Sequence, residues 1–255
     1  MTPLSGPSRA TRGLLDQALL PYHRGVRAHT RESQTTMRPE HALQYLREGN
    51  QRFCANLRSN RDLLRQVNET REGQFPFATI LSCIDSRTSA ELIFDQGFGD
   101  IFSIRIAGTV INEDILGSME FATKVAGSKL LVVLGHSNCG AIKGACDHIQ
   151  LGNLSTLLNK IEPSVYFERQ TRENRTSKNP DFVAKVSTIQ VHRSVEAVIE
   201  HSLVLRQLIE SGELGLVGAH YAIETGEVTF YDGTYMCGQV RHFYLDVPER
   251  TSLLP

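Results

Sequence analysis

Short apolar runs alternate along the middle of the chain with segments in which apolar residues recur every three or four positions. The first pattern is typical of buried strands and the second of helices packed on a core. Their regular alternation predicts a parallel sheet with right-handed helical crossovers. The predicted strands cover residues 77–82, 101–106 and 129–134, and the predicted helices cover 40–50, 90–96 and 114–125.

The second half of the chain predicts more helices and then a strand pair. Helices are expected at 141–148, at 154–161 and from about 182 to 211, with a polar loop at 169–181. Strands at 214–223 and 227–231 would pair through the Thr225-Gly226 turn. We therefore expect an α/β fold, with a mainly parallel central β-sheet flanked by helices, an N-terminal helical arm and a C-terminal strand pair.

The first part of the chain differs in composition from the rest. Residues 1–31 carry five Arg against one acidic residue, which faintly resembles an organelle transit peptide. Alternatively, the apolar residues between Leu14 and Leu19 form a short amphipathic helix that ends at Pro21. We predict an N-terminal extension at 1–38 and a single α/β domain at 39–255.

Composition limits the partners that the protein can bind and the cell compartment in which it can work. The 255 residues carry a formal net charge of −1, so no overall field attracts nucleic acid or an anionic membrane. No apolar run approaches the roughly 20 residues that span a bilayer. Five cysteines, an odd number, argue against a disulfide framework and for a reducing compartment. A cytoplasmic protein without nucleic-acid or membrane partners is expected.

Candidate metal ligands follow two of the predicted strands. Cys83 comes directly after the strand at 77–82, and His136 and Cys139 follow the strand at 129–134. Open α/β sheets bind ligands at the carboxyl ends of their strands, so a fold of this class would bring the three side chains together. Two thiolates and one imidazole are zinc ligands, and three protein ligands leave a fourth position for water, as in catalytic zinc sites. We predict Zn²⁺ as the cofactor.

Asp85 and Arg87 extend this cluster. At positions i and i+2 in extended backbone they share a face and can form a fixed carboxylate–guanidinium pair. One interpretation is a structural salt bridge at the end of the sheet. In the other, Arg87 orients Asp85 beside a zinc-bound water, whose pKa falls from about 15.7 to near 7.

Cys83-x-Asp85-Ser86-Arg87 together with His136-x-x-Cys139-Gly140 resembles the β-class carbonic anhydrases, and the similarity extends from about residue 42 to 232. The resemblance implies a zinc enzyme that interconverts carbon dioxide and bicarbonate, as a homodimer that can pair into a homotetramer. It implies that Cys83, His136 and Cys139 bind the metal and that Asp85 and Arg87 form the catalytic dyad. In some members the Asp also closes onto zinc as a fourth ligand.

The same resemblance suggests four substrate-binding residues. Gln74 matches a residue that donates to the substrate across the dimer interface, and Phe102 matches an aromatic pocket residue. Ala107 and Gly108 match small residues that leave room for carbon dioxide.

Four residues depart from the family pattern. Phe121 stands where many members have Tyr, and Ile106 and Thr109 replace two common Asn. Ile80 replaces the Trp of members that have a regulatory bicarbonate pocket, so we predict no switch of that type. Two alternatives stay open: a hydrolase of carbonyl sulfide or carbon disulfide that uses the same site, and a non-catalytic protein that zinc stabilises as a sensor or interaction partner.

Overall fold

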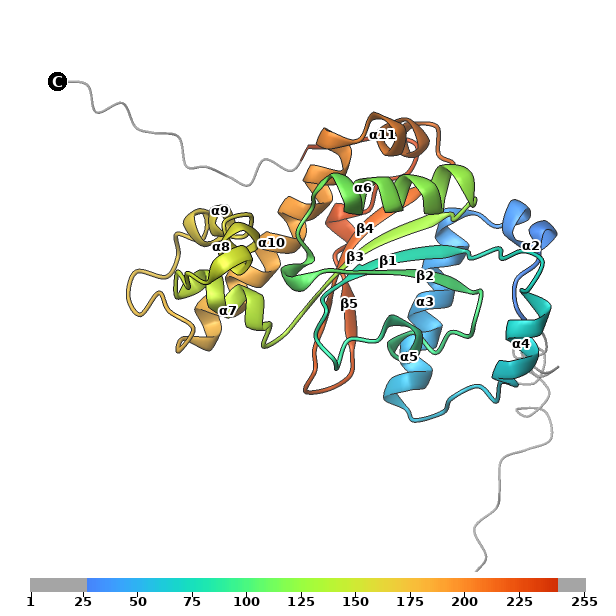
Figure 1. Cartoon of the computed structure of the whole chain (residues 1–255), viewed down its shortest axis with the longest axis horizontal. Helices are drawn as coiled ribbons and strands as arrows, with labels where there is room; N and C mark the ends of the chain where they lie inside the picture. The colour runs from blue at the N-terminus through green and yellow to red at the C-terminus, as the bar shows by residue number, and fades with distance from the viewer. Residues whose placement is uncertain (1–26, 243–255) are drawn as a thin grey trace, which may run out of the picture.

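A central five-stranded sheet with helices on both faces forms the body of the protein (Figure 1). The computed structural model describes residues 27–242. The strand order is β2-β1-β3-β4-β5, in which β2, β1, β3 and β4 are parallel and β5 is antiparallel to β4. The strands are β1 (Ala78–Ser82), β2 (Ile101–Arg105), β3 (Leu130–His136), β4 (Gly215–Tyr221) and β5 (Val228–Phe230). The expected parallel sheet and C-terminal strand pair are confirmed.

The helices connect and cover these strands. Side-chain caps start several of them: Asn112 accepts from the Ile115 backbone N–H at the start of α6, and Asn179 caps α10 just before Pro180. In chain order the helices are α2 (Arg31–Thr36), α3 (Pro39–Cys54), α4 (Leu63–Glu69), α5 (Ala90–Ile93), the 3₁₀-helix η1 (Ala107–Thr109), α6 (Glu113–Glu120), the π-helix η2 (Phe121–Val125), α7 (Gly140–Cys146), α8 (Gly152–Leu158), α9 (Glu162–Phe167), α10 (Pro180–His201), α11 (Leu203–Glu210) and the 3₁₀-helix η3 (Asp232–Thr234).

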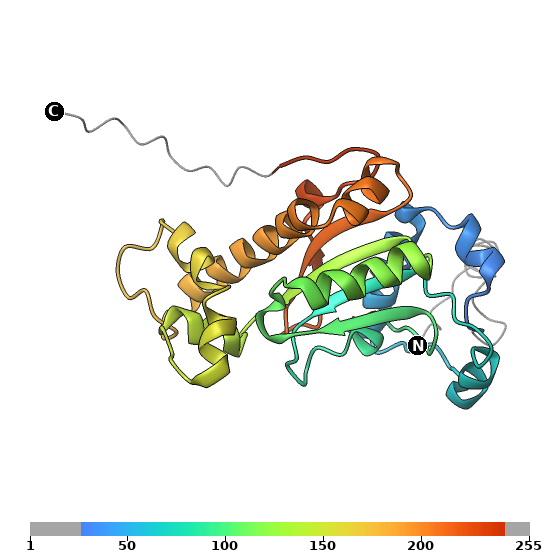
Figure 2. The same ribbon diagram turned by 45° about the horizontal axis from the view of Figure 1, so that its top comes forward.

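Alternate residues of a strand pack into two separate cores, one on each face of the sheet, because successive side chains of a strand point to opposite faces. Ile80 packs in the core on the side of α3 and α5, together with Leu46 and Phe94. Leu81, the next residue, packs on the opposite side with α6, α10 and α11. Figure 2 shows α6 and α10 lying across that second face. Both faces of the central strands β1 and β3 are buried, which is why their sequence is largely apolar.

The strand order creates a switch point at the carboxyl ends of β1 and β3. From β1 the chain passes through α5 to β2 on one side, whereas from β3 it passes through helices α7 to α11 to β4 on the other side. Connections that leave two neighbouring strands in opposite directions open a crevice between their ends. A third core of residues from α7 to α10 covers this end of the sheet, and Cys83 and Cys139 belong to it.

Several element boundaries differ from the sequence-based ones. The helix predicted at 90–96 ends at Ile93, because Asp95 turns the chain with a φ of 45°. The helix predicted at 114–125 continues past Glu120 as a π-helix. Helices α2, α4 and α9 were not expected, and the helix predicted around Leu14–Leu19 lies outside the described residues. The division at residue 38 stays a prediction.

No helix within residues 27–242 is both long and apolar enough to cross a membrane.

Candidate metal centre

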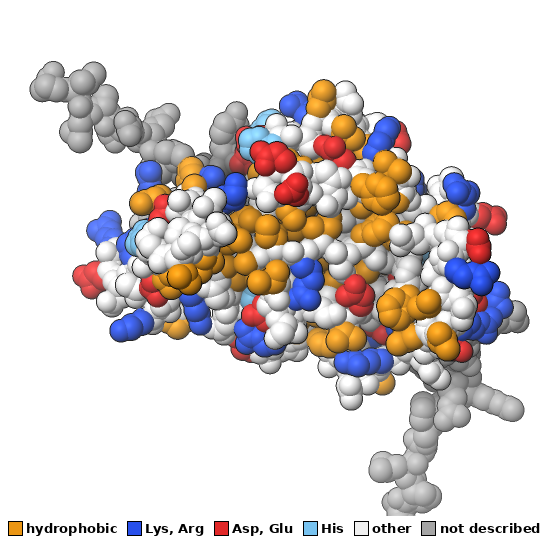
Figure 3. Space-filling model, in the orientation of Figure 1, with side chains coloured by type: hydrophobic (Ala, Val, Ile, Leu, Met, Phe, Trp, Pro, Cys, Tyr) orange, Lys and Arg blue, Asp and Glu red, His pale blue; other side chains and the backbone are white. Residues whose placement is uncertain are grey.

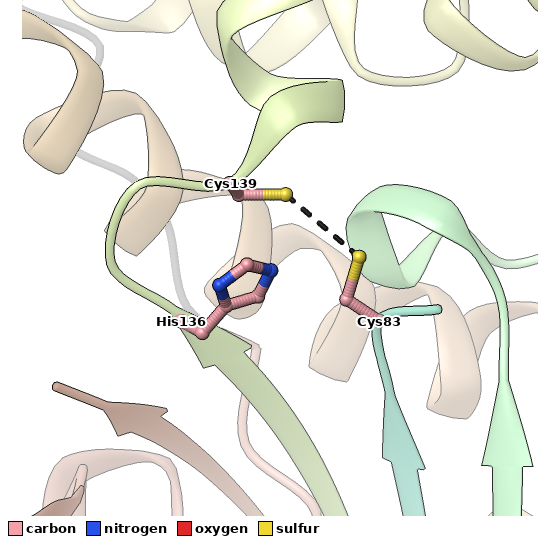
Figure 4. A group of neighbouring side chains, drawn as sticks. All are labelled: Cys83, His136 and Cys139. Atoms are coloured by element: carbon pink, nitrogen blue, oxygen red, sulfur yellow. Dashed lines mark hydrogen bonds between the residues drawn. The ribbon is translucent and has the colours of Figure 1, made fainter. Parts of the chain in front are cut away.

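Three side chains converge at the switch point (Figure 4). Cys83 directly follows β1, His136 ends β3, and Cys139 is the residue before α7. Their donor atoms all lie within 4.8 Å of one another, and the two Sγ atoms are 3.9 Å apart. All three residues are buried. The convergence predicted from the strand ends is therefore present in the fold.

The orientation of the His136 ring is set by its own backbone neighbour. Nδ1 lies 2.8 Å from the carbonyl oxygen of Ser137, which is an acceptor only, so Nδ1 carries the proton and donates. Nε2 is then an acceptor, and it is buried without a hydrogen-bond partner in the described part of the chain. A buried lone pair next to two thiols calls for a cation. The donor set of two sulfurs and one imidazole nitrogen fits Zn²⁺.

The two thiols strongly influence each other's protonation. A hydrogen bond from Cys139 lowers the pKa of Cys83 to about 4, and the backbone N–H groups of Gly108 and Asp85 act in the same direction. The thiolate on Cys83, together with burial, raises the pKa of Cys139. One proton is thus shared between two sulfurs, and a metal cation between them would take its place.

Asp85 and Arg87 form a two-pronged ion pair beside the three donors. Arg87 donates from Nε to Oδ1 at 2.9 Å and from Nη2 to Oδ2 at 2.8 Å, and its backbone N–H also reaches Oδ1. These hydrogen bonds hold the pKa of Asp85 well below its usual range. The Asp85 carboxylate does not belong to the group of mutually close donors, so it faces Arg87.

Arg105 and Thr88 hold the loop that carries this pair. Arg105, the last residue of β2, donates from Nε to the carbonyl of Cys83 at 3.0 Å and from Nη2 to that of Asp85 at 2.6 Å. The Thr88 hydroxyl reaches the same two carbonyls. Two side chains from different elements therefore fix the backbone on both sides of residue 84.

A small cavity of about 10 Å³ lies against the donors. That volume is about enough for the centre of one water-sized molecule. At its wall Gly108 has a φ of 66°, and a Cβ there would lie 2.4 Å from Cδ1 of Ile161, so only glycine fits. The lining residues are Cys83, Gly108, Thr109, Gly135, His136, Cys139, Ile142, Ser187, Gln190 and Val191.

Helix α10 contributes polar residues to this wall that were not predicted from the sequence. The Ser194 hydroxyl donates to the Thr109 carbonyl at 2.9 Å, and Gln190 accepts from Ser164 at 2.7 Å. Ser187, Gln190 and Ser194 are all buried. They recur at helical spacing among apolar residues, and this buried polar stripe is the signal that could have identified them.

A family model described as carbonic anhydrase matches residues 78–228, which is more than half of the chain and includes every residue of the metal cluster. The chain belongs to the β-carbonic anhydrase family. It is an enzyme of that family, and its cofactor is zinc.

Relatives found by sequence and by structure agree with this family assignment. Carbonic anhydrase 2 of Mycobacterium tuberculosis is 35% identical over 202 residues, covering 76% of this chain and 93% of the relative. The carbonic anhydrase of Mycolicibacterium smegmatis is 33% identical over 197 residues, covering 74% and 92%. The solved β-carbonic anhydrase CcaA superposes with a TM-score of 0.61 at 27% identity, covering 78% and 93%. Tetrameric β-carbonic anhydrases of Sordaria macrospora share the fold, with a TM-score of 0.58 and 22% identity, covering 65% and 85%.

Two of the residues singled out by the resemblance lie away from the cavity of this β-carbonic anhydrase subunit. Gln74 is exposed and precedes β1, whereas Cys83 follows it, and five strand residues span roughly 16 Å. Phe102 on β2 is in register with Thr79, near the start of β1. Ala107 lies beside Gly108 in η1. Within one subunit, Gln74 and Phe102 are not brought to the metal cluster.

The departures from the family pattern occupy different environments. Thr109 lines the cavity. Ile80 is fully buried in the core under α3. Phe121 is 54% exposed at the start of η2, on the segment that returns toward the amino end of β3. Phe121 therefore does not line this subunit's own cavity.

Proposed function

We propose that this β-carbonic anhydrase catalyses the reversible hydration of carbon dioxide to bicarbonate and a proton, with Cys83, His136 and Cys139 as the zinc ligands. One observation carries the proposal: three buried donors converge, and Asp85, two residues beyond Cys83, pairs with Arg87 instead of completing the set. A purely structural zinc site would normally recruit a fourth protein ligand. When bound, zinc lowers the pKa of a coordinated water and so supplies a nucleophile near neutral pH.

Asp85 and Arg87 act as the dyad that orients this nucleophile. Arg87 keeps the Asp85 carboxylate ionised and fixed in direction. An ionised carboxylate only accepts hydrogen bonds, so Asp85 takes one from the attacking water and aims the water's lone pair at the substrate carbon. Ala107 and Gly108 of η1 lie at the part of the wall beside which a small linear substrate would bind. A closed form in which Asp85 binds zinc would require Arg87 to release it.

The complete site is assembled by two subunits of a homodimer. Gln74 and Phe102 lie toward the amino end of β1, away from this subunit's metal cluster, and the family resemblance assigns Gln74 to the metal centre of the partner. Two features support such an interface. Strand β2 has one unpaired edge among the described residues, and a band of hydrophobic side chains runs across the face that carries β2 and α6 (Figure 3). Pairing of dimers into a tetramer, as in the Sordaria macrospora enzymes, extends the same proposal.

Two further points belong to this proposal. The enzyme works in the cytoplasm, a reducing compartment that suits two cysteines assigned to zinc and three, Cys54, Cys146 and Cys237, that form no disulfide. It also lacks the bicarbonate switch, because Ile80 fills the place of the pocket Trp and the Arg105 guanidinium is bound to the Cys83 and Asp85 carbonyls.

Stopped-flow measurement of carbon dioxide hydration tests the proposal directly. The zinc-loaded protein should turn over far faster than the Cys83→Ser variant, which lacks a ligand and serves as the blank. Equal rates from neutral to alkaline pH would contradict it. In that case sulfide release from carbonyl sulfide or carbon disulfide would assign the hydrolase function, and absence of both activities would leave a zinc-stabilised sensor or interaction protein.

A further inference from the structure

One carboxylate holds both residues that lie between the metal ligands His136 and Cys139. The Ser137 hydroxyl donates to Oε2 of Glu224 at 2.7 Å, and the Asn138 amide donates to Oε1 at 2.7 Å. Glu224 belongs to the turn between β4 and β5, 86 residues further along the chain than Asn138. The short segment that presents two of the three ligands is therefore tied to a separate element.

Ser137 transmits this contact to the imidazole. Its backbone N–H donates to the Tyr221 carbonyl at 3.0 Å, and its hydroxyl accepts from the Ile223 N–H at 2.9 Å while donating to Glu224. With three bonds to the hairpin, the Ser137 carbonyl is fixed in space. That carbonyl is the acceptor for Nδ1 of His136, so it determines where Nε2 points.

Asn138 transmits the contact toward Cys139. Its φ of 56° lies in the left-handed region, which residues other than glycine adopt at a cost in free energy. Glu224 accepts from its Nδ2, and Lys143 of α7 donates to its Oδ1 at 3.1 Å. The side chain is thus held from both sides, and the turn it makes delivers Cys139 to the start of α7.

We propose that Glu224 is a positioning residue that holds the metal-binding segment 136–139 in place and thereby slows zinc release. It touches neither metal nor substrate and acts through Ser137 and Asn138. The inference rests on the zinc assignment of the proposed function, but not on the reaction catalysed. The hydrogen bond from Ser137 also lowers the pKa of Glu224, which keeps the carboxylate ionised and able to accept two hydrogen bonds at neutral pH.

Zinc release from the full-length, zinc-loaded protein tests this role. Transfer of zinc to an excess of the chromophoric chelator 4-(2-pyridylazo)resorcinol is followed by absorbance. Glu224→Ala should release zinc about tenfold faster than the unaltered protein, the lower end of the range for residues that support metal ligands. Glu227→Ala is the matched control, because Glu227 is an exposed acid in the same turn, with no hydrogen bond to residues 136–139, and it should release zinc at the original rate.

A second variant separates hydrogen bonding from charge. Glu224→Gln keeps one oxygen for Ser137, so its release rate should lie between those of the unaltered protein and Glu224→Ala. The double variant Ser137→Ala/Glu224→Ala should release zinc more slowly than the product of the two single effects predicts, because both remove the same contact.

Three results would overturn the proposal. These are a Glu224→Ala rate equal to that of Glu227→Ala, equal rates for the Gln and Ala variants, and effects of Ser137→Ala and Glu224→Ala that multiply. The assay needs no turnover, so a protein that binds zinc tightly but does not hydrate carbon dioxide would refute the proposed function and leave this inference testable.

Discussion

At the scale of single residues, Asp85 gives the most direct test of the proposed reaction. Both of its oxygens accept hydrogen bonds from Arg87, and its charge interacts with His136 of the metal cluster. Asp85→Asn should keep bound zinc but lower carbon dioxide hydration at least a hundredfold, because an amide cannot present two acceptor oxygens. Stopped-flow rates with parallel measurement of zinc content check this. Unchanged turnover at full zinc occupancy would remove Asp85 from the mechanism.

Asp95 is a second acidic residue with a purely structural role. Its carboxylate accepts from Arg52 at 2.6 Å, from Ser59 and from the buried Arg61. Asp95→Ala should lower the free energy of unfolding by about 3–5 kcal/mol, because the largely buried Arg61 and the half-buried Arg52 lose the carboxylate that they share. Asp232→Asn is the control: it breaks an exposed pair with Arg47 and should cost less than about 1 kcal/mol. Urea unfolding measures both, and equal losses would refute the contrast.

The Asp95 cluster also predicts a pH dependence of stability. Burial alone would raise the pKa of Asp95, but hydrogen bonds from Arg52, Arg61 and Ser59 outweigh it and lower the pKa. A lowered pKa in the folded state means that the stabilisation is fully present above the unfolded pKa of about 3.9 and disappears as the pH falls through the lower folded value. Between pH 5 and pH 3, approximately, the unaltered protein should therefore lose more stability than Asp95→Ala in urea unfolding. Parallel losses would contradict this assignment.

At the scale of elements, helix α2 fastens the start of the described chain to the amino end of the sheet. The buried Gln34 side chain donates to the carbonyls of Pro76 at 2.7 Å and Ala126 at 2.9 Å. Gln34→Ala should lower the free energy of unfolding by about 1–3 kcal/mol, because two carbonyls lose their donor. Thr35→Ala, on the exposed side of α2, should change it little. Denaturant midpoints compare them, and equal shifts would mean that the Gln34 bonds contribute nothing.

Elements whose cause is local could be predicted from the sequence. The strands that deliver Cys83 and His136 are apolar runs bounded by polar residues, so their ends and the metal cluster followed from periodicity and spacing. Features that depend on distant partners could not. Helix α5 stops early because Asp95 is drawn into contact with Arg52 and Arg61, and nothing near Ile93 in the sequence indicates this.

The same distinction holds within the metal centre. The ligands and the Asp85–Arg87 pair stand in two short motifs, whereas Glu224 and Gln190 reach the centre through contacts with residues 26 to 87 positions away. Such pairs are specified by the packing of β4, β5 and α10 on the sheet: the polar stripe of α10 can mark Gln190 as unusual, but it does not indicate which residue Gln190 contacts.

At the scale of the whole molecule, sharing of sites between subunits can be tested by complementation. If Gln74 serves the partner's metal, a mixed dimer of Cys83→Ser and Gln74→Ala subunits contains one intact site. Random assembly of the two subunits should then restore about a quarter of the original activity, more than the mean of the two parents. Co-expression followed by carbon dioxide hydration assays measures this.

The control mixture combines Cys83→Ser with Cys139→Ser. Each metal centre takes all three of its ligands from one subunit, and each kind of subunit in this mixture lacks one of them. Every site is therefore defective, and no activity should return. Recovery in neither mixture would place the role of Gln74 within its own subunit or outside catalysis.

The place of the proposed ligands in the fold would also give the metal a mechanical role. Cys83 and Cys139 lie 56 positions apart in the chain, and the segment between them contains α5, β2, α6 and β3. An ion held by both ends cross-links this segment into a closed loop. A covalent link closing a loop of that length would remove chain entropy worth about 4 kcal/mol from the unfolded state. Zinc should thus act as a staple on the central strands, so its removal by a chelator should lower the melting temperature.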